Sequence, residues 1–192
     1  MTTEHPILFN SAMIRAILDG TKSQTRRIVK PQPEYGVDGK IVPLESFTGD
    51  KRMRHQVALA KQCPYGQHGS KLWARETWAH LGGFLPEIAY RADGQDMTTD
   101  EAFKRWRPSI HMPRWASRIT LEITDIRVER VQDISERDAI AEGCNTSDVG
   151  PYAILPTARG RFQYLWDTIN GKTYPWRSNP WVFVVSFRRI HP

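Results

Sequence analysis

The stretch Gly20-Thr21-Lys22-Ser23-Gln24-Thr25-Arg26-Arg27 gathers cationic and hydroxyl side chains directly after a predicted helix. The apolar residues before it recur at helical spacing: Met13, Ile14, Ile17 and Leu18. Asn10 or Ser11 is suited to cap that helix, and Gly20 is suited to end it. The segment from Lys22 to Arg27 is therefore predicted on a turn or short strand beyond the helix.

Lys22 and Thr25 within this stretch have side chains that can support catalysis. A lysine whose pKa is lowered by burial or by neighbouring cations can act as a base. A threonine hydroxyl beside such a base can act as a nucleophile. The competing interpretation is an ordinary solvated basic turn, which the residue types alone favour.

Length and composition predict a single domain in the cytoplasm. The chain has 192 residues and a formal net charge of +6, which weakly favours an anionic partner such as RNA. No secretory signal and no apolar run of membrane-spanning length are evident, so we expect a cytoplasmic protein without a membrane segment. Cys63 and Cys144 are then expected as reduced thiols, with one bridge between them as the alternative.

Several common site types find no support in the sequence. The six His and two Cys residues lack the ligand spacing of a zinc site, so no metal is predicted. The glycines form neither a P-loop nor a dinucleotide fingerprint, and no Gly-x-Ser-x-Gly elbow supports a Ser-His-Asp site. We therefore predict no cofactor.

Strand and helix patterns indicate an α+β fold. Strands are predicted over 6–9, 71–76, 119–131 and 181–188. A change of side-chain parity in the third of these predicts a bulge near Asp125. Ser135 is predicted to cap a helix over 136–142 that Gly143 ends, and Thr157 to cap another. This order suggests a small, mostly antiparallel β-barrel with helices packed around it.

Two further segments are less regular. Residues 31–56 contain three prolines, several glycines and mixed charges, and we predict a long irregular excursion there. Residues 98–101 are typical of a capping box, which predicts a short helix ending before Pro108.

The pattern Gly20-x-Lys22-Ser23-x-Thr25-x-Arg27 resembles the signature of the ASCH family, the activating signal cointegrator homology domains. The resemblance extends through Gly69-x-x-Leu72-Trp73-x-Arg75-Glu76, the strand over 119–131, the helix over 135–143 and the last strand over 181–188. It implies a β-barrel of the PUA-like superfamily.

A narrower resemblance is to ASCH proteins encoded by phages and prophages. It rests on Leu72-Trp73-Ala74-Arg75-Glu76-Thr77-Trp78 and on Cys63-Pro64-Tyr65-Gly66. On this view residues 1–192 are one ASCH domain, larger than the small bacterial members because of insertions at about 31–60 and 79–117.

The resemblance implies a catalytic site. Some small bacterial ASCH proteins are amidohydrolases that remove acyl groups from the exocyclic amine of N4-acetylcytidine, using a Lys, a Thr and a Glu. Those residues fall on Lys22, Thr25 and Glu142 here. Thr25 would attack the acyl carbonyl, Lys22 would serve as general base and Glu142 would orient Lys22. Ser23, or backbone N–H groups after the helix, would stabilise the oxyanion.

Other residues are predicted to contact a modified nucleoside or RNA. Arg26 or Arg27 would hold a phosphate or a nucleobase oxygen. Trp73 is either core or a stacking surface for a base, and Glu76 is either a second acid or half of a structural Arg–Glu pair. Arg114 is expected to line the same cleft. The alternatives to the enzyme are a non-catalytic RNA- or nucleotide-binding module, a ribonuclease, and a phage accessory protein that only keeps the fold.

Overall fold

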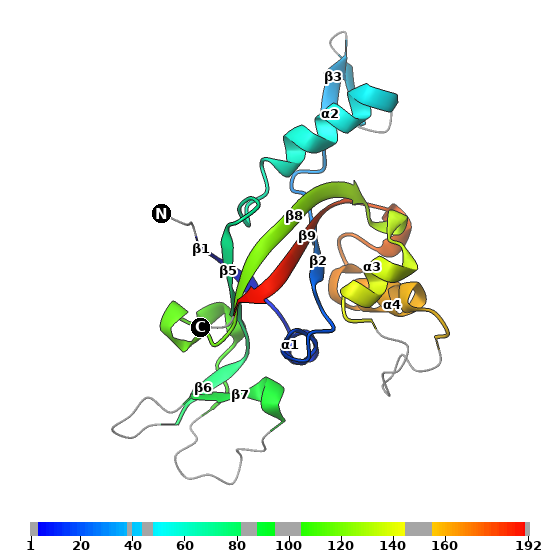
Figure 1. Cartoon of the computed structure of the whole chain (residues 1–192). Coiled ribbons are helices and arrows are strands. Elements are labelled where there is room, and N and C mark those ends of the chain that lie inside the picture. The colour runs from blue at the N-terminus through cyan, green and yellow to red at the C-terminus, as the bar shows by residue number, and fades with distance from the viewer. Residues whose placement is uncertain are drawn as a thin grey trace.

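A five-stranded mixed sheet forms the centre of the protein in this computed structural model, which describes residues 4–37, 40–43, 48–81, 88–94, 105–144 and 155–190. The strand order is β1-β5-β8-β9-β2. The strands span β1 Glu4–Leu8, β2 Gln24–Ile28, β5 Lys71–Arg75, β8 Thr120–Arg130 and β9 Trp181–Ile190. The pairing of β1 with β5 is parallel and the other three pairings are antiparallel. β2 therefore lies at one edge of the sheet (Figure 1).

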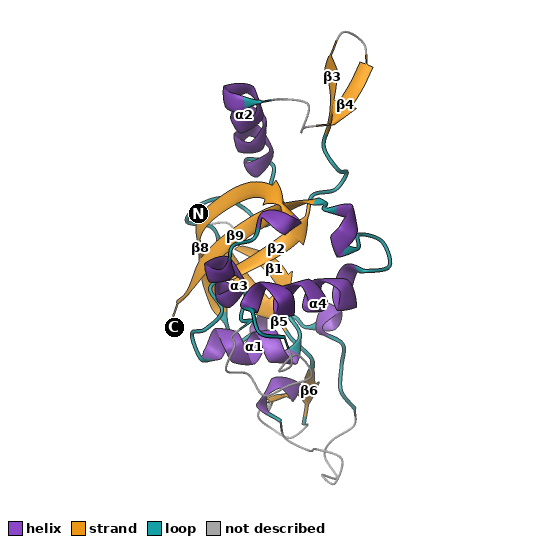
Figure 2. Cartoon of the chain, turned by 90° about the vertical axis from the view of Figure 1, so that its right-hand side faces the viewer, coloured by secondary structure: helices purple, strands orange, loops and turns teal. Residues whose placement is uncertain are grey.

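Helices cover both faces of this sheet. The α-helices of the described residues are α1 Ser11–Leu18, α2 Gly49–Ala60, α3 Glu136–Ala141 and α4 Ala158–Asn170. Figures 1 and 2 show α3 and α4 next to each other on the side of β2, with α1 below the sheet. Short 3-10 turns follow the strands and loops at Arg91–Asp93, Ser109–His111, Arg114–Ala116, Val131–Asp133 and Trp176–Ser178.

The alternation of side chains along β9 explains why helices are needed on both faces. Phe183, Val185 and Phe187 belong to the core cluster that contains Ile14 and Ile17 of α1. The intervening residues Val182 and Val184 belong to a second cluster, with Phe162 and Trp166 of α4. Because successive residues of a strand point to opposite faces, β9 buries both of its sides.

The sequence-based expectations for this body are largely confirmed. The class is α+β, the sheet is mostly antiparallel and the register of β8 against β9 shifts between Ile123 and Asp125. Ser135 accepts a hydrogen bond from the Asp138 N–H and so caps α3. Thr157 caps α4 in the same way. The closed PUA-like barrel stays a prediction, because β1 and β2 end the strand order of the described sheet.

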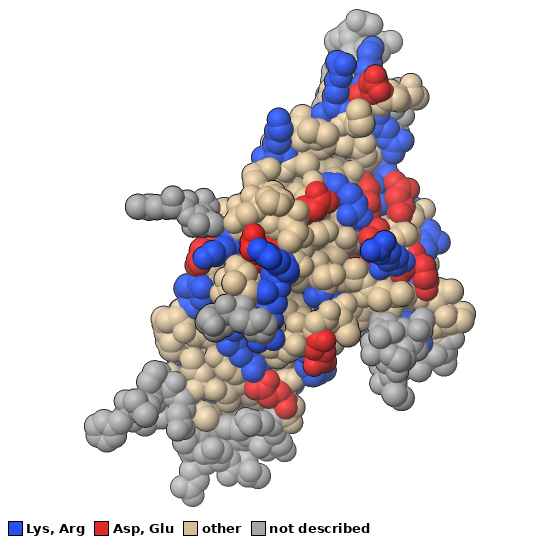
Figure 3. Space-filling view, in the orientation of Figure 1, with Lys and Arg blue, Asp and Glu red and all other residues tan. Residues whose placement is uncertain are grey.

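The expectation of an irregular segment over 31–56 is wrong. Strand β3, Glu34–Val37, pairs with β4, Lys40–Pro43, and α2 follows them. The proline and glycine content hid this hairpin, and α2 has no fully buried residue whose spacing would mark a helix. α2 and the hairpin both extend from the same end of the body as an arm (Figures 1 and 2), and Lys and Arg side chains are visible on it around α2 (Figure 3).

Two expectations concern other parts of the chain. The short helix predicted from residues 98–101 lies outside the described residues. A further two-stranded sheet pairs β6, Trp78–His80, with β7, Ile88–Tyr90, below β5. Among the described parts of the chain, no helix combines the length and the hydropathy that a membrane span requires.

Candidate functional site

The chain between α1 and β2 is fixed in place by backbone hydrogen bonds. Gly20 has a φ of 75°, and the N–H groups of Thr21 and Lys22 both donate to the Ala16 carbonyl. Ser23 N–H then donates to the carbonyl of Ala141 at the end of α3. Lys22 and Glu142 form an isolated β-bridge there. These bonds bring the end of α3 against the start of β2.

Lys22 is wholly inside the protein. Its ammonium donates to Glu142 Oε2 at 2.8 Å, to the Glu142 carbonyl at 2.7 Å and to the Gln24 carbonyl at 2.8 Å. The side chain of Lys22 is 0% exposed and that of Glu142 is 3% exposed. Burial lowers the pKa of Lys22, and the Glu142 carboxylate opposes that shift. The predicted approach of Lys22 and Glu142 is confirmed.

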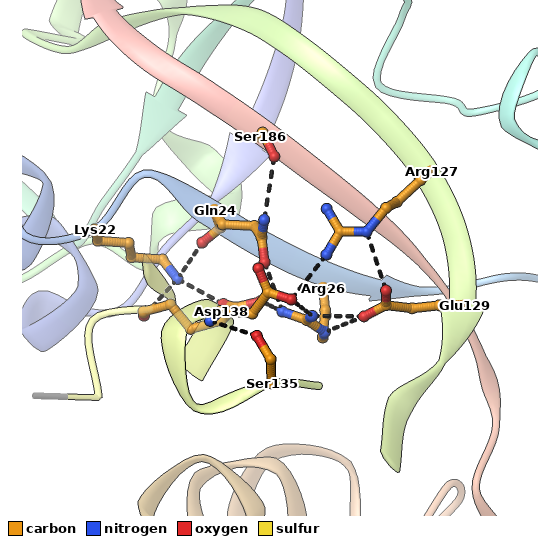
Figure 4. A network of polar contacts seen from close by, with 9 residues as sticks. Lys22, Gln24, Arg26, Arg127, Glu129, Ser135, Asp138 and Ser186 are labelled. Carbon is orange, nitrogen blue, oxygen red and sulfur yellow. Dashed lines mark hydrogen bonds and ion pairs between the residues drawn. The ribbon is translucent and has the colours of Figure 1, made fainter. Parts of the chain in front are cut away.

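Arg26 also contacts Glu142 and is buried, and Figure 4 shows its side chain between Gln24 and Glu129. Its Nη1 is 3.2 Å from Glu142 Oε1 and 2.8 Å from Gln24 Oε1. Its other nitrogens donate to Glu129 Oε1 and to Asp138 Oδ2. The two oxygens of Glu142 therefore face different cations. The role of Arg26 in substrate binding stays a prediction, and the contacts seen here are all within the protein.

The complete network balances its charges. Its cations are Lys22, Arg26 and Arg127, and its carboxylates are Glu129, Asp138 and Glu142. Burial raises the pKa of Asp138 while the neighbouring Arg127 and Arg26 lower it, and the net shift is downward. Buried charges are tolerated when each is paired and hydrogen-bonded. A purely structural network would have the same contacts, so any chemical role depends on the space beside it.

Thr25 lines a small cavity beside this network. The cavity has a volume of about 70 Å³, and Glu142 and Phe162 also line it. Thr25 itself is 3% exposed. Among the hydrogen bonds of the described residues, none joins the Thr25 hydroxyl to Lys22, whose three protons go to other acceptors. The three predicted catalytic residues therefore lie in one region, without a direct contact between nucleophile and base.

Three of the backbone N–H groups after the helix are already occupied. Those of Thr21, Lys22 and Ser23 are bonded to carbonyls, so the expectation of a backbone donor for the oxyanion stays a prediction for the residues beyond Ser23. The Ser23 side chain belongs to an exposed residue and does not line the cavity. Because Ser23 and Val29 bond to β9, antiparallel alternation turns the backbone of Arg26 away from β9. Its N–H is the better candidate donor.

Arg27 differs from Arg26 in having no acidic partner within ion-pair distance among the described residues. Its Nη2 donates to the Leu8 carbonyl at 2.5 Å, and its buried Nε has no hydrogen-bond partner. The guanidinium carbon lies 5.4 Å from the centre of the Phe9 ring. Burial lowers the pKa of Arg27. The residue lines both the small cavity and a larger cleft beside it.

Three predicted substrate-binding residues lie elsewhere. The Glu76 carboxylate is 2% exposed and bonds to Arg118 at 3.0 and 3.1 Å, which matches the structural alternative. Trp73 stacks against Arg75 on β5, and Arg114 pairs with Glu4 on an exposed surface. None of the three lines either cavity described here.

Within the described residues, no three His, Cys, Asp or Glu side chains are placed to hold a metal ion. Cys63 and Cys144 are separate buried thiols.

Sequence reasoning missed the partners of Arg26. Glu129 and Asp138 have the pattern of ordinary solvent-facing charges on a strand and a helix. The available signal was the alternation of side chains, because Lys22, Gln24 and Arg26 occupy every second position and so share one side of an extended chain.

Comparisons with known proteins add no relative: no family model matches the chain, and neither a curated protein nor a solved structure is significantly similar to it.

Proposed function

We propose that this protein is an amidohydrolase of the ASCH type that removes a small acyl group from a modified nucleobase, as in N4-acylcytidine. The observation that carries the proposal is the buried Lys22–Glu142 pair beside a cavity lined by Thr25. The three residues come from two segments far apart in sequence, at the positions that the resemblance assigns. A PUA-like barrel is part of the same proposal, supported by the antiparallel run β5-β8-β9-β2.

The chemistry begins with Thr25. Its hydroxyl oxygen attacks the acyl carbon while the hydroxyl proton passes to the neutral amine of Lys22. The carbon–nitrogen bond then breaks, and Lys22 returns the proton to the departing exocyclic amine. Water then attacks the ester on Thr25 and gives a proton to Lys22. Lys22 passes this proton to the Thr25 oxygen as the ester bond breaks. The Arg26 N–H, which directly follows Thr25 and points away from β9, would donate to the oxyanion.

Lys22 must change its contacts for this sequence to run. As an ammonium it donates all three protons to Gln24 and Glu142, so it has no lone pair for Thr25. Burial favours the neutral amine, which donates two protons and can accept one. Release of one acceptor, such as the Gln24 carbonyl, would turn the lone pair toward the cavity.

The volume of the cavity sets the size of the acyl group. At about 70 Å³, it offers the space of roughly two water molecules. A short acyl group such as acetyl fits this volume better than a long or branched one. The enzyme is therefore expected to prefer N4-acetylcytidine to derivatives with longer acyl chains.

The deciding experiment follows hydrolysis of N4-acylcytidines by chromatography, using Thr25→Val and Thr25→Ser as a matched pair. Valine has the branched shape of threonine but no hydroxyl, whereas serine is smaller and retains the hydroxyl. Thr25→Val should lose about 10²-fold or more in kcat/KM, and Thr25→Ser should lose much less. Unchanged melting temperatures serve as the control for folding. Equal activity in the two variants would exclude Thr25 as the nucleophile.

A non-catalytic nucleotide- or RNA-binding module of phage origin is the second candidate. The complete bonding of the Lys22 ammonium favours it, since a purely structural lysine would be bonded in this way. In that case wild-type protein would bind nucleotides without turnover of any acylcytidine, and Lys22→Ala would only weaken binding. Incubation of the wild-type protein with single-stranded RNA would test the ribonuclease alternative in the same series.

A further inference from the structure

A large open cleft adjoins the small cavity. Its volume is about 1110 Å³, and its walls come mainly from residues 27–33 at the end of β2 and beyond it, 59–65 at the end of α2 and 169–174 at the end of α4. Arg27, Ile28, Ile169 and Asn170 line both spaces, so the cavity and the cleft lie side by side. A ligand pocket typically occupies about 300–1,000 Å³, so this cleft has room for more than a nucleoside base.

Hydrogen bonds hold two walls of the cleft in place. The Gln32 amide donates to the carbonyls of Val29 and Trp181 at 2.7 and 3.1 Å, and its oxygen accepts from the Trp181 N–H. On the opposite side, the indole N–H of Trp166 donates to the Tyr174 carbonyl at 2.8 Å. The cleft is therefore formed before any ligand binds, which reduces the entropic cost of binding.

The charged residues that line the cleft are all positive. Arg27, Lys30 and Lys172 line it, and no Asp or Glu is among the described residues of its walls. Lys30 and Lys172 are exposed at the rim. Arg27 lies deeper, with its buried Nε lacking an acceptor. The neighbouring Arg26 is neutralised by three carboxylates, so the absence of such a partner for Arg27 leaves an anion-binding position at the junction of the two spaces.

Two tyrosines supply apolar surface in the same cleft. Tyr65 and Tyr174 are both half-buried. Lys30 Nζ lies 5.7 Å from the centre of the Tyr174 ring, which brings a cation and an aromatic face together. Cations interleaved with aromatic rings are the usual means of binding a nucleotide or a single strand, through its phosphates and its bases or sugars.

We propose that the cleft binds the phosphate, sugar and base of a nucleotide whose acyl group enters the small cavity. The substrate is then a phosphorylated nucleotide, free or within a single strand, rather than a free nucleoside. Arg27 holds the phosphate at the junction, and Lys30 and Lys172 add charge at the rim. This inference rests on the proposed function for the placement of the acyl group, but phosphate binding is measured without turnover.

The test compares equilibrium binding of cytidine, cytidine 5′-monophosphate and a cytidine-containing single-stranded hexanucleotide to the full chain by calorimetry at low salt. The monophosphate should bind at least about tenfold more tightly than cytidine, as one well-formed ion pair allows. The double variant Lys30→Gln/Lys172→Gln and the single variant Arg27→Gln should each remove most of that advantage. Arg91→Gln, which neutralises an exposed arginine outside the cleft, is the matched control.

Each outcome supports or overturns the proposal. A further gain for the hexanucleotide would identify a strand as the ligand, provided that the salt slope falls by about 0.7 for each phosphate that the variants no longer bind. Equal binding of monophosphate and hexanucleotide would identify a free nucleotide. The proposal would be overturned if cytidine and its monophosphate bound equally well, or if inorganic phosphate at the same concentration displaced the monophosphate completely. It would also be overturned if Arg91→Gln lost as much affinity as the cleft variants. Binding with these features but no hydrolysis of acetylated ligands would retain the cleft and remove the amidohydrolase.

Discussion

Lys22 and Glu142 lie 120 positions apart in the chain, and their side chains meet at 2.8 Å inside the protein. The second oxygen of Glu142 faces Arg26 at 3.2 Å. Desolvation cancels much of the attraction in a buried pair, so such a pair adds little net stability over apolar residues. Removal of one partner is costly, however, because the other charge is left buried and uncompensated. Each carboxylate of the network pairs with two cations, but Glu142 is the most buried of the three, so its loss should be the most costly.

Glu142→Gln is expected to destabilise the protein strongly. The substitution keeps the shape of the side chain and removes the charge that Lys22 and Arg26 share, so the free energy of unfolding should fall by about 3–5 kcal/mol. Glu122→Gln is the control, because Glu122 pairs with Arg188, whose side chain is 69% exposed, and should cost less than about 1 kcal/mol. Urea denaturation of both variants gives the comparison. Similar losses would mean that Glu142 does not neutralise buried charge.

Gly143→Ala should disturb Lys22 through packing. Gly143 has a φ of 88°, and a Cβ there would lie 3.2 Å from Ala16 Cβ and 3.4 Å from Lys22 Cβ. Gly94 has a φ of 75° with no atom within 4 Å of such a Cβ, so Gly94→Ala isolates the backbone strain of about 1–2 kcal/mol. Gly143→Ala should lower the melting temperature further and, unlike the control, reduce turnover. Equal effects of the two substitutions would show that the neighbours of Gly143 adjust freely.

Local patterns in the sequence predicted the elements that frame the site. The alternation of Phe183, Val185 and Phe187 predicted one face of β9, and the parity change predicted the irregularity near Asp125. Ser135 caps its helix as expected. These features depend on residues that are close in the chain, where propensity and periodicity carry the information.

Contacts between distant segments were much harder to predict. The approach of Lys22 to Glu142 followed only from the resemblance, because no local pattern relates residues 120 positions apart. The sequence favours neither the acid nor the structural role for Glu76, because its partner Arg118 comes from another segment. The arm that contains α2 was missed because its residues bury too little apolar surface to leave a periodic signal.

Glu76 should make the stability of the protein depend on pH in the acid range. Burial raises its pKa above the ordinary value of 4.5, although Arg118 opposes the shift. The folded state therefore binds this proton more tightly than the unfolded state, and the free energy of unfolding falls as pH rises from 4.5 through the folded-state pKa. Glu76→Gln has no carboxyl group to titrate at this position. Wild type should therefore lose stability relative to this variant as pH rises from 4.5 through the folded-state pKa of Glu76.

Urea denaturation of wild type and Glu76→Gln at a series of pH values measures this difference. Glu122→Gln serves as the control and should follow wild type across the same window. A difference between wild type and Glu76→Gln that does not change with pH would show that Glu76 titrates alike in the folded and unfolded states.

The pH dependence of turnover should report Lys22 if it is the base. Burial lowers the pKa of Lys22 below its ordinary value of 10.5, and the Glu142 carboxylate raises it again in part. Because the neutral amine is the active form, kcat should rise with pH and be lost as pH falls through this pKa. Glu142→Gln removes the raising influence, so the midpoint of the profile should move to lower pH in the fraction that remains folded, as monitored by circular dichroism. The measurement is kcat against pH on the acetylated substrate, with Glu122→Gln as the control that keeps the wild-type midpoint. An unchanged midpoint in Glu142→Gln would assign the titration to a group other than Lys22.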